Sequence, residues 1–214
     1  AEGARDPAVN AEDIDELGVA FDAQRNAFVW RTRPAAGEVV AAAHALDLPS
    51  DYTTELHFAA RGLVRSLGAM LERGVMLFID YGFPAREYYH PQRNRGTLMC
   101  HYRHQAHDDP LQLPGLQDIT AHVDFSAIAA AGCEAGLETL GYTTQAQFLI
   151  NCGITDILAE TPATDAAAYL PLAAAAQKLL SPAEMGELFK VLALGRNFSA
   201  PLLGFRSGDR RATL

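Results

Sequence analysis

The sequence predicts an α/β fold, and three observations lead to this prediction. A continuous apolar segment, Val75–Gly82 (VMLFIDYG), has the length and composition of a strand that is buried on both faces. An amphipathic segment with capping residues comes directly before it. Further helical and strand-like segments alternate after it. Strands that alternate with helices are typical of α/β proteins with a partly parallel sheet.

The first part of the chain predicts four segments. Residues 1–16 are polar, acidic and interrupted by proline, which is typical of a flexible lead-in. Residues 17–32 alternate apolar and polar side chains around Arg25-Asn26, which indicates a β-hairpin. Residues 53–73 begin with capping candidates, carry leucines at helical spacing and precede Gly74, so we expect an amphipathic helix that leads into the strand at 75–82.

The second part predicts a similar alternation. Asp124 or Ser126 is the expected cap of a helix that ends near Gly136, because either side chain can accept a hydrogen bond from the first turn. The remaining expected elements are extended segments at 96–104 and 118–123, a short strand at Leu137–Tyr142, helices at 145–160 and 165–180 with a kink or restart at Pro171, and a buried strand at 188–195.

Composition excludes several classes of protein. The 214 residues are 49% hydrophobic and 20% charged, which is typical of a globular chain. The formal net charge of −9 argues against a nucleic-acid partner. No apolar run reaches the roughly 18–20 residues of a membrane span, so no membrane partner is expected. The three cysteines lack CxxC spacing, which disfavours a disulfide framework or structural zinc and favours a reducing compartment.

One polar stretch stands out from this acidic background. Tyr88–Asp109 (YYHPQRNRGTLMCHYRHQAHDD) contains four His, three Arg and three Tyr in 22 residues. Such a stretch fits three kinds of site, namely a metal site, an anion clamp or one wall of a larger active site. The residues themselves allow these alternatives to be compared.

A metal site is disfavoured by geometry. His101, His104 and His107 are spaced three apart, but the segment is expected to be extended, and such pairs then point to opposite faces of a strand. The His122-x-Asp124 pattern is too common to indicate a metal. An anion clamp by neighbouring arginines lacks any glycine-rich phosphate loop to accompany it. The alternative for each arginine is an ion pair with a nearby acid that fixes the loop.

The end of the apolar strand is a better candidate for a site. Asp80 and Tyr81 lie where a strand of an open α/β sheet ends, and ligands bind beyond such carboxyl ends. The alternative for Asp80 is a structural role in capping the turn. No GxSxG elbow is present, Cys100 is expected to be a packed thiol, and His44 and His57 are expected to be surface or half-buried residues.

Four segments carry a specific resemblance. They are IDYGFPAREYYHPQRNRGTLMCHYRHQAHDDPL, GLQDITAHVDFSAIAAAG, TTQAQFLINCGI and PAEMGELFKVLALG. From about residue 17 to the C-terminus, the chain resembles the MidA family of class I S-adenosylmethionine-dependent methyltransferases. That family includes a mitochondrial assembly factor of complex I that methylates a protein arginine.

The resemblance implies a fold and a function. It implies the C-terminal part of a Rossmann-like methyltransferase domain over 17–214, with Val75–Asp80 as a parallel-type strand and Leu137–Tyr142 antiparallel to Phe189–Leu194. It implies S-adenosyl-L-methionine as cofactor and a protein arginine as substrate. The residues expected beside substrate or cofactor are Asp80, Tyr81, Tyr88, Tyr89, His90, Arg93, Arg95, His122 and Asp124, with no catalytic residue assigned among them and no metal expected.

The sequence departs from the family in one respect. The family's glycine-rich cofactor loop and the acid that binds the ribose have no counterpart in these 214 residues, so we expect the chain alone to be inactive. A homo-oligomer is also expected, because half a sheet leaves an edge and an apolar face uncovered. The resemblance implies a bacterial cytoplasm or a mitochondrial matrix. Two alternatives stay open, a non-catalytic assembly module that uses the surface of Tyr88–Asp109 and a metallohydrolase.

Overall fold

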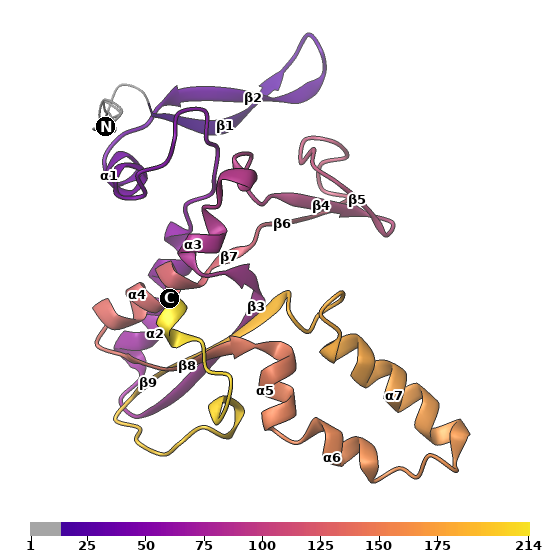
Figure 1. Ribbon diagram of the computed structural model, residues 1–214. Coiled ribbons are helices and arrows are strands. Elements are labelled where there is room, and N and C mark those ends of the chain that lie inside the picture. Colours follow the sequence, from indigo (N-terminus) through magenta and orange to yellow (C-terminus); the bar gives the residue numbers. More distant parts are fainter. Residues whose placement is uncertain (1–13) are drawn as a thin grey trace, which may run out of the picture. The chain divides into compact units, whose positions relative to one another are not determined.

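The computed structural model describes residues 14–214 (Figure 1). These residues form two compact units, each of which is described by itself. The hairpin unit contains the described residues up to Leu56 together with Tyr89–Ala121, and the core unit contains His57–Tyr88 and His122–Leu214. The predicted lead-in, 1–16, lies outside the described residues except at its end, where Asp15 already begins a strand.

The hairpin unit is built from short strands. Strands β1 and β2 pair antiparallel from Asp15↔Pro34 to Asp22↔Ala27, which confirms the predicted hairpin. Strands β4, β5 and β6 form a separate antiparallel sheet in the order β5-β4-β6. The elements are β1 (Asp15–Asp22), β2 (Ala27–Pro34), α1 (Glu38–Ala45), the 3₁₀ helix η2 (Pro91–Arg93), β4 (Met99–Tyr102), β5 (Gln105–His107) and β6 (Asp118–Thr120).

The core unit contains the main sheet and most of the helices (Figure 1). Its elements are α2 (Phe58–Met70), β3 (Gly74–Phe83), α3 (Ala85–Tyr88), β7 (Val123–Asp124), α4 (Phe125–Glu134), β8 (Glu138–Thr144), α5 (Gln145–Asn151), α6 (Ile154–Ala159), α7 (Ala166–Leu180), β9 (Phe189–Arg196), η3 (Leu203–Phe205) and η4 (Arg211–Thr213). Every helix among residues 14–214 is too short or too polar to cross a membrane.

The main sheet has the strand order β7-β3-β9-β8. Strand β9 is antiparallel to β3 on one side and to β8 on the other, whereas β7 is parallel to β3 over two residue pairs. The predicted mixed sheet and the antiparallel pairing of Leu137–Tyr142 with Phe189–Leu194 are therefore confirmed. This is the arrangement that the α/β prediction requires.

Strand β9 carries a core on each of its faces. Leu192 and Leu194 point to the side of α2 and α4, where Val64 and Phe125 complete one apolar cluster. The alternating residues of β9 point to the other side, where they pack with η3 and α5 in a second cluster. A β-bulge at Leu140 in β8 shifts the alternation of that strand, so that both clusters receive a side chain from it.

One prediction about the central apolar strand is wrong. The segment 75–82 does form β3, but Leu77 and Ile79 are 51% and 53% exposed, so the strand is not buried on both faces. Met76 and Phe78, on the opposite face, pack against the cluster formed with α2 and α4. No element among residues 14–214 buries the face of Leu77 and Ile79. The strand pairs antiparallel with β9 for most of its length rather than in the parallel manner expected.

Several element boundaries also differ from the predictions. Helix α2 begins at Phe58 instead of near 53, because Thr53 is extended and pairs with Arg95 in a parallel bridge. The single helix expected at 145–160 is divided into α5 and α6, because Gly153 has a left-handed backbone (φ 89°) that an α-helix cannot continue.

The other boundary differences are smaller. Helix α7 continues through Pro171 as one helix, so of the two alternatives expected there, a kink or a restart, the restart does not occur. Helix α1 was not predicted; none of its side chains is buried, so it lacks a clear apolar face. The capping prediction for the helix after residue 123 is resolved in favour of Asp124, whose carboxylate accepts a hydrogen bond from the Ala127 amide at 3.1 Å.

A pair of leucine substitutions tests the central position of β9. Leu192 is 0% exposed, whereas Leu77 on the neighbouring strand is half-exposed. We expect Leu192→Ala to lower the free energy of unfolding by about 2–5 kcal/mol, because it leaves a cavity in a packed core. Leu77→Ala removes the same atoms from a solvated face and should cost about 0.5 kcal/mol. Urea denaturation of both variants measures the difference, and equal losses would contradict the assigned core.

Candidate active site

Three strands of the core unit have their ends on the same edge of the sheet. Because β3 and β8 both run antiparallel to β9, their carboxyl ends lie beside the amino end of β9. The register places Asp80 and Thr144 opposite Lys190, and Tyr81 opposite Phe189. Ligands of α/β sheets bind beyond the carboxyl ends of the strands, so this edge is where a site is expected.

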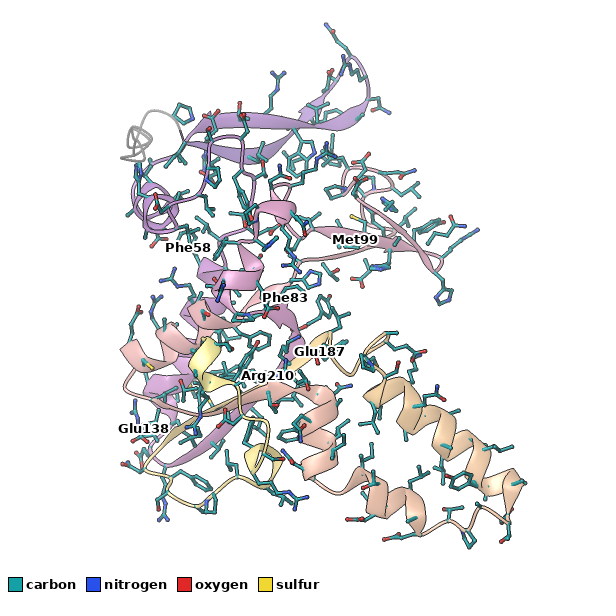
Figure 2. All side chains as sticks on the ribbon, viewed as in Figure 1. Phe58, Phe83, Met99, Glu138, Glu187 and Arg210 are labelled. Carbon is teal, nitrogen blue, oxygen red and sulfur yellow. The ribbon has the colours of Figure 1, made fainter. Side chains whose placement is uncertain are left out.

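Aromatic rings gather at this edge. The ring of Tyr81 meets those of His122 and Phe189 edge to face, each at 5.4 Å between centroids. The imidazole of His122 also stacks on Phe83 at 5.2 Å with an interplanar angle of 25°. These four side chains, with Asp80 and Lys190, form what we call the strand-end cluster. Phe83 is labelled in Figure 2.

Gly82 allows β7 to approach β3 closely enough to complete the cluster. A Cβ atom at position 82 would lie 2.1 Å from the carbonyl oxygen of Val123, which is far inside contact distance. The close approach permits the parallel pairs Gly82↔Val123 and Phe83↔Asp124. It therefore brings His122, the residue before β7, to the rings of β3.

The two acids of this region have different environments. Asp124 is 3% exposed and caps α4, so its carboxylate has a structural task. Asp80 is exposed, and only its Oδ1 has a hydrogen bond within the described chain, from the Tyr81 amide at 2.8 Å. This bond is to the next residue within β3, so Oδ1 contacts the local backbone, while Oδ2 accepts no hydrogen bond within residues 14–214. The ligand-binding role of Asp80 stays a prediction.

Lys190 is the buried cation of the strand-end cluster. It is 4% exposed, and its Nζ lies 5.3 Å from the centroid of Phe83. The ammonium donates hydrogen bonds to the carbonyl oxygens of Glu187 and Leu188, which offsets part of its desolvation. The carboxylate of Glu187 itself is paired with Arg210 at 2.7 Å (Figure 2). Lys190 therefore holds the start of β9 in place beside Phe83.

Tyr88 is a buried member of the polar stretch. It is 1% exposed, and its hydroxyl lies 2.9 Å from Nε2 of His57, with the two rings edge to face at 5.8 Å. His57 is half-buried, which is one of the two positions expected for it, and it precedes α2 as its N-cap residue. The pair joins α3, which directly follows β3, to the start of α2.

The remaining predicted residues of the polar stretch belong to the hairpin unit. Tyr89 and Arg93 are half-buried, whereas His90 and Arg95 are exposed. Nδ1 of His90 accepts a hydrogen bond from the Gln92 amide at 3.3 Å and caps η2, and its backbone carbonyl accepts one from the Tyr52 hydroxyl at 3.0 Å. In the neutral ring the proton then resides on Nε2.

Arg95 has no ion pair within residues 14–214. Its backbone is held by Thr53 in two ways. Arg95 pairs with Thr53 in a parallel β-bridge, and the carbonyl oxygen of Asn94 accepts a hydrogen bond from the Thr53 amide at 2.9 Å. Arg25, Arg33, Arg65, Arg210 and Arg211 do form ion pairs with acids of the described chain. The guanidinium of Arg95 is consequently exposed on a fixed backbone, which suits binding an acceptor oxygen.

Glu55 fixes the segment that follows Arg95. Its carboxylate accepts hydrogen bonds from the amides of Thr97 and Leu98 at 2.9 and 3.1 Å, and from the Thr97 hydroxyl at 3.1 Å. Gly96 has φ +80°, and a Cβ there would lie 2.4 Å from the same carboxylate. The glutamate is 42 residues away from Thr97 in sequence, and the pattern of residues did not indicate this contact.

Neither a nucleophile nor a metal site emerges from the polar stretch. Cys100 is 0% exposed, as predicted, and burial raises the pKa of its thiol, with the negative charges of Asp109, Asp108 and Asp118 adding to the effect. No group of three or more His, Cys, Asp or Glu residues within 14–214 is arranged to hold a metal ion.

The structure divides the nine predicted site residues between the two units. The core unit contains Asp80, Tyr81, Tyr88, His122 and Asp124; the hairpin unit contains Tyr89, His90, Arg93 and Arg95. Within the core unit, Tyr81 and His122 are in direct contact. The sequence did not single out Phe83, Phe189, Lys190, His57 or Glu55, which position the predicted residues.

The described residues do not form a complete site for S-adenosylmethionine. Such a site in an α/β sheet needs a glycine-rich turn and a helix N-terminus after a strand, with an acid for the ribose. Here β3 ends at Phe83 and is followed by Pro84 and by α3, a helix of four residues. Asp80 and Tyr81 offer contacts at the edge, but no cradle for the whole cofactor.

The chain belongs to a family of methyltransferases. The model of the family described as "Putative S-adenosyl-L-methionine-dependent methyltransferase" matches residues 8–143, which is more than half of the chain. The resemblance seen in the sequence is confirmed at this level, with S-adenosylmethionine as the cofactor of the family.

Curated relatives agree with this assignment. The mitochondrial protein arginine methyltransferase NDUFAF7 of Rattus norvegicus is 35% identical over 124 residues, which cover 56% of this chain and 26% of the rat protein. The protein of the same name from Danio rerio is 33% identical over 118 residues, with 55% and 26% covered. The match thus spans about a quarter of the length of these relatives.

Two solved structures from Burkholderia thailandensis share the fold. One, bound to S-adenosyl-homocysteine, is 57% identical with a TM-score of 0.88 and covers 94% of this chain and 52% of that chain. The other, a native crystal structure, is also 57% identical, with a TM-score of 0.89, and covers 94% of this chain and 54% of that chain. The chain therefore spans about half the length of these structures.

Removal of the Glu55 carboxylate tests how the segment after Arg95 is held. We expect Glu55→Ala to speed hydrogen exchange at the amides of Thr97 and Leu98 by roughly tenfold or more, since each bond to a charged acceptor contributes about 1.5–3 kcal/mol. Glu38→Ala is the control, because Glu38 is exposed in α1 and accepts no such bonds within residues 14–214. Unchanged exchange at Thr97 in Glu55→Ala would show that the loop is held by other contacts.

Proposed function

We propose that this chain forms the substrate side of an S-adenosylmethionine-dependent methyltransferase that acts on a protein arginine side chain. The observation that carries the proposal is the strand-end cluster, which brings the exposed carboxylate of Asp80 and the Tyr81–His122 ring pair to the same edge of the sheet. The names of the curated relatives, which are protein arginine methyltransferases, support the choice of substrate.

The chemistry of this cluster suits a guanidinium. A carboxylate binds a guanidinium through paired, charge-assisted hydrogen bonds, and aromatic faces attract the same cation. In our proposal the open Oδ2 of Asp80 accepts from the substrate guanidinium, and Tyr81 limits its rotation. Holding the guanidinium in one orientation lowers the entropy cost of methyl transfer. Lys190 and Phe83 keep the rings of this edge in place.

The cofactor supplies the methyl group, and this chain supplies the acceptor side. Transfer to a guanidinium nitrogen forms one N–C bond, breaks the bond of that methyl group to sulfur and releases one proton to solvent. We propose that the cofactor is bound mainly by residues outside these 214. The incomplete cofactor site and the exposed face of Leu77 and Ile79 in β3 both support this proposal.

The hairpin unit contributes the second part of the proposal. Arg95 presents an exposed guanidinium on a backbone fixed by Thr53. We propose that it binds a carboxylate or carbonyl oxygen of the substrate protein. We propose that His90 and Tyr89 also face the substrate protein. Tyr88 is buried and Arg93 is half-buried, and we propose that these two residues brace the polar stretch Tyr88–Asp109. Asp124 supports the site from the start of α4.

Three further points belong to the same proposal. We assign the chain more finely to the MidA family, because the four sequence segments quoted above resemble that family. The location is a bacterial cytoplasm, because the more similar of the known proteins are bacterial at 57% identity, whereas the more distant relatives are mitochondrial by name. The partner is a protein, and no observation within residues 14–214 favours a metallohydrolase.

An arginine substitution tests the substrate-side assignment. In a form of the protein that binds S-adenosylhomocysteine, we expect Arg95→Ala to lower kcat/KM for methyl transfer by roughly tenfold to a hundredfold, because one charge-assisted hydrogen bond to substrate is lost. The dissociation constant of S-adenosylhomocysteine, measured by calorimetry, should stay the same.

Arg73→Ala is the matched control for this experiment. Arg73 is equally exposed but lies before β3, at the opposite end of the strand from Asp80. Its substitution should leave methyl transfer unchanged. If Arg95→Ala retains full turnover, or if it weakens only the binding of S-adenosylhomocysteine, Arg95 does not belong to the substrate side.

A further inference from the structure

The β1–β2 hairpin presents an uncovered apolar face. Leu17, Val19 and Phe21 of β1 alternate onto the same face as Phe28 and Trp30 of β2, because the register pairs Val19 with Trp30 and Phe21 with Phe28. All five side chains are exposed, from 43% for Phe28 to 59% for Phe21. We call these five residues the aromatic face. The rings of Phe21 and Phe28 meet edge to face at 5.9 Å.

The opposite face of the same hairpin is charged. Glu16 and Arg33, which are partners in the register, form an ion pair at 2.8 Å there. Arg31 and Asp22 lie on this charged face as well. A sheet with one apolar and one charged face is the usual pattern of a sheet that packs against another layer through its apolar side. A two-stranded hairpin is marginal in water without such a layer.

The residues that precede the hairpin do not match the aromatic face chemically. The segment AEGARDPAVNAED contains four acidic residues and no aromatic one, and Val9 is its only large apolar residue. The five residues of the aromatic face carry no charge, and Asp15, which alternates onto the same side, lies at the end of β1 away from Phe21. A matching occupant must therefore offer apolar surface, and the aromatic face itself is such a surface.

We propose that the aromatic face is the contact by which two copies of this chain associate, hairpin against hairpin around a two-fold axis. A two-fold axis places the same patch on both partners, so an uncharged face meets its own copy without repulsion. At 150–250 Å² per aromatic side chain, the half-exposed residues leave roughly 500 Å² per chain, so two copies bury roughly 1,000 Å², the size at which specific interfaces begin.

The net charge of the chain makes a separate test of this contact possible. Each copy carries −9, so two copies repel one another through surfaces other than the aromatic face. Added salt screens that repulsion and leaves the apolar contact intact. Association should therefore strengthen as sodium chloride is raised, in contrast to binding that depends on ion pairs.

Sedimentation equilibrium and tryptophan fluorescence on the same samples test the proposal. Trp30 is the only tryptophan of the chain, so its emission reports on the aromatic face alone. We expect dimer to form with rising protein concentration and the Trp30 emission to shift to the blue in parallel. Replacing Val19 and Phe21 together by serine keeps the reporter and should raise the dissociation constant roughly a hundredfold or more.

Arg31→Ser is the matched control, because Arg31 is exposed on the charged face of the same strand as Trp30. It should leave the dissociation constant unchanged, and circular dichroism should confirm that both variants are folded. A monomer at all concentrations overturns the proposal, whether Trp30 is solvated or is covered by another segment. A dimer that survives the replacement of Val19 and Phe21 overturns it as well.

Discussion

The pairing of β9 with a strand on each side is the constraint on which the core unit depends. Residues 190–195 of β9 are buried without exception, and the side chains of residues 191–194 alternate between the two apolar clusters. Because β9 is antiparallel to both neighbours, it fixes β3 and β8 as parallel to each other and brings their carboxyl ends to one edge. The position of Asp80 and Tyr81 is thus a consequence of packing around β9.

The same pairing explains why a lysine is buried at the start of a core strand. Lys190 lies opposite Asp80 in the register, and its ammonium turns to the carbonyls of Glu187 and Leu188 and to the ring of Phe83. The buried ammonium of Lys190 and the exposed carboxylate of Asp80 make this edge of the sheet polar, while the apolar clusters stay closed to solvent. Phe83 and His122 add aromatic faces, so the edge combines an exposed carboxylate with rings, the two kinds of group that our proposal assigns to the substrate guanidinium.

The sequence predicted those features that depend on local patterns. Apolar runs located β3 and β9, alternation located the hairpin, and the residues before a helix included Asp124 as one of two candidate caps. Features that depend on register or on distant contacts were missed. The ring contacts of Tyr81 need the offset of β3 against β9, and Glu55 binds a loop 42 residues away. Exposure of Leu77 could not be foreseen, since an apolar run does not say which face is covered.

The central claim is that this chain provides the substrate side of a methyltransferase and that the cofactor is bound mainly by residues outside it. Calorimetric titration of S-adenosylhomocysteine into the isolated 214-residue chain tests this claim most directly. The account predicts no measurable binding, because the contacts available near Asp80 amount to only a few hydrogen bonds of about 1 kcal/mol each, far from the roughly 8 kcal/mol of a micromolar ligand. A micromolar dissociation constant for the isolated chain would contradict it.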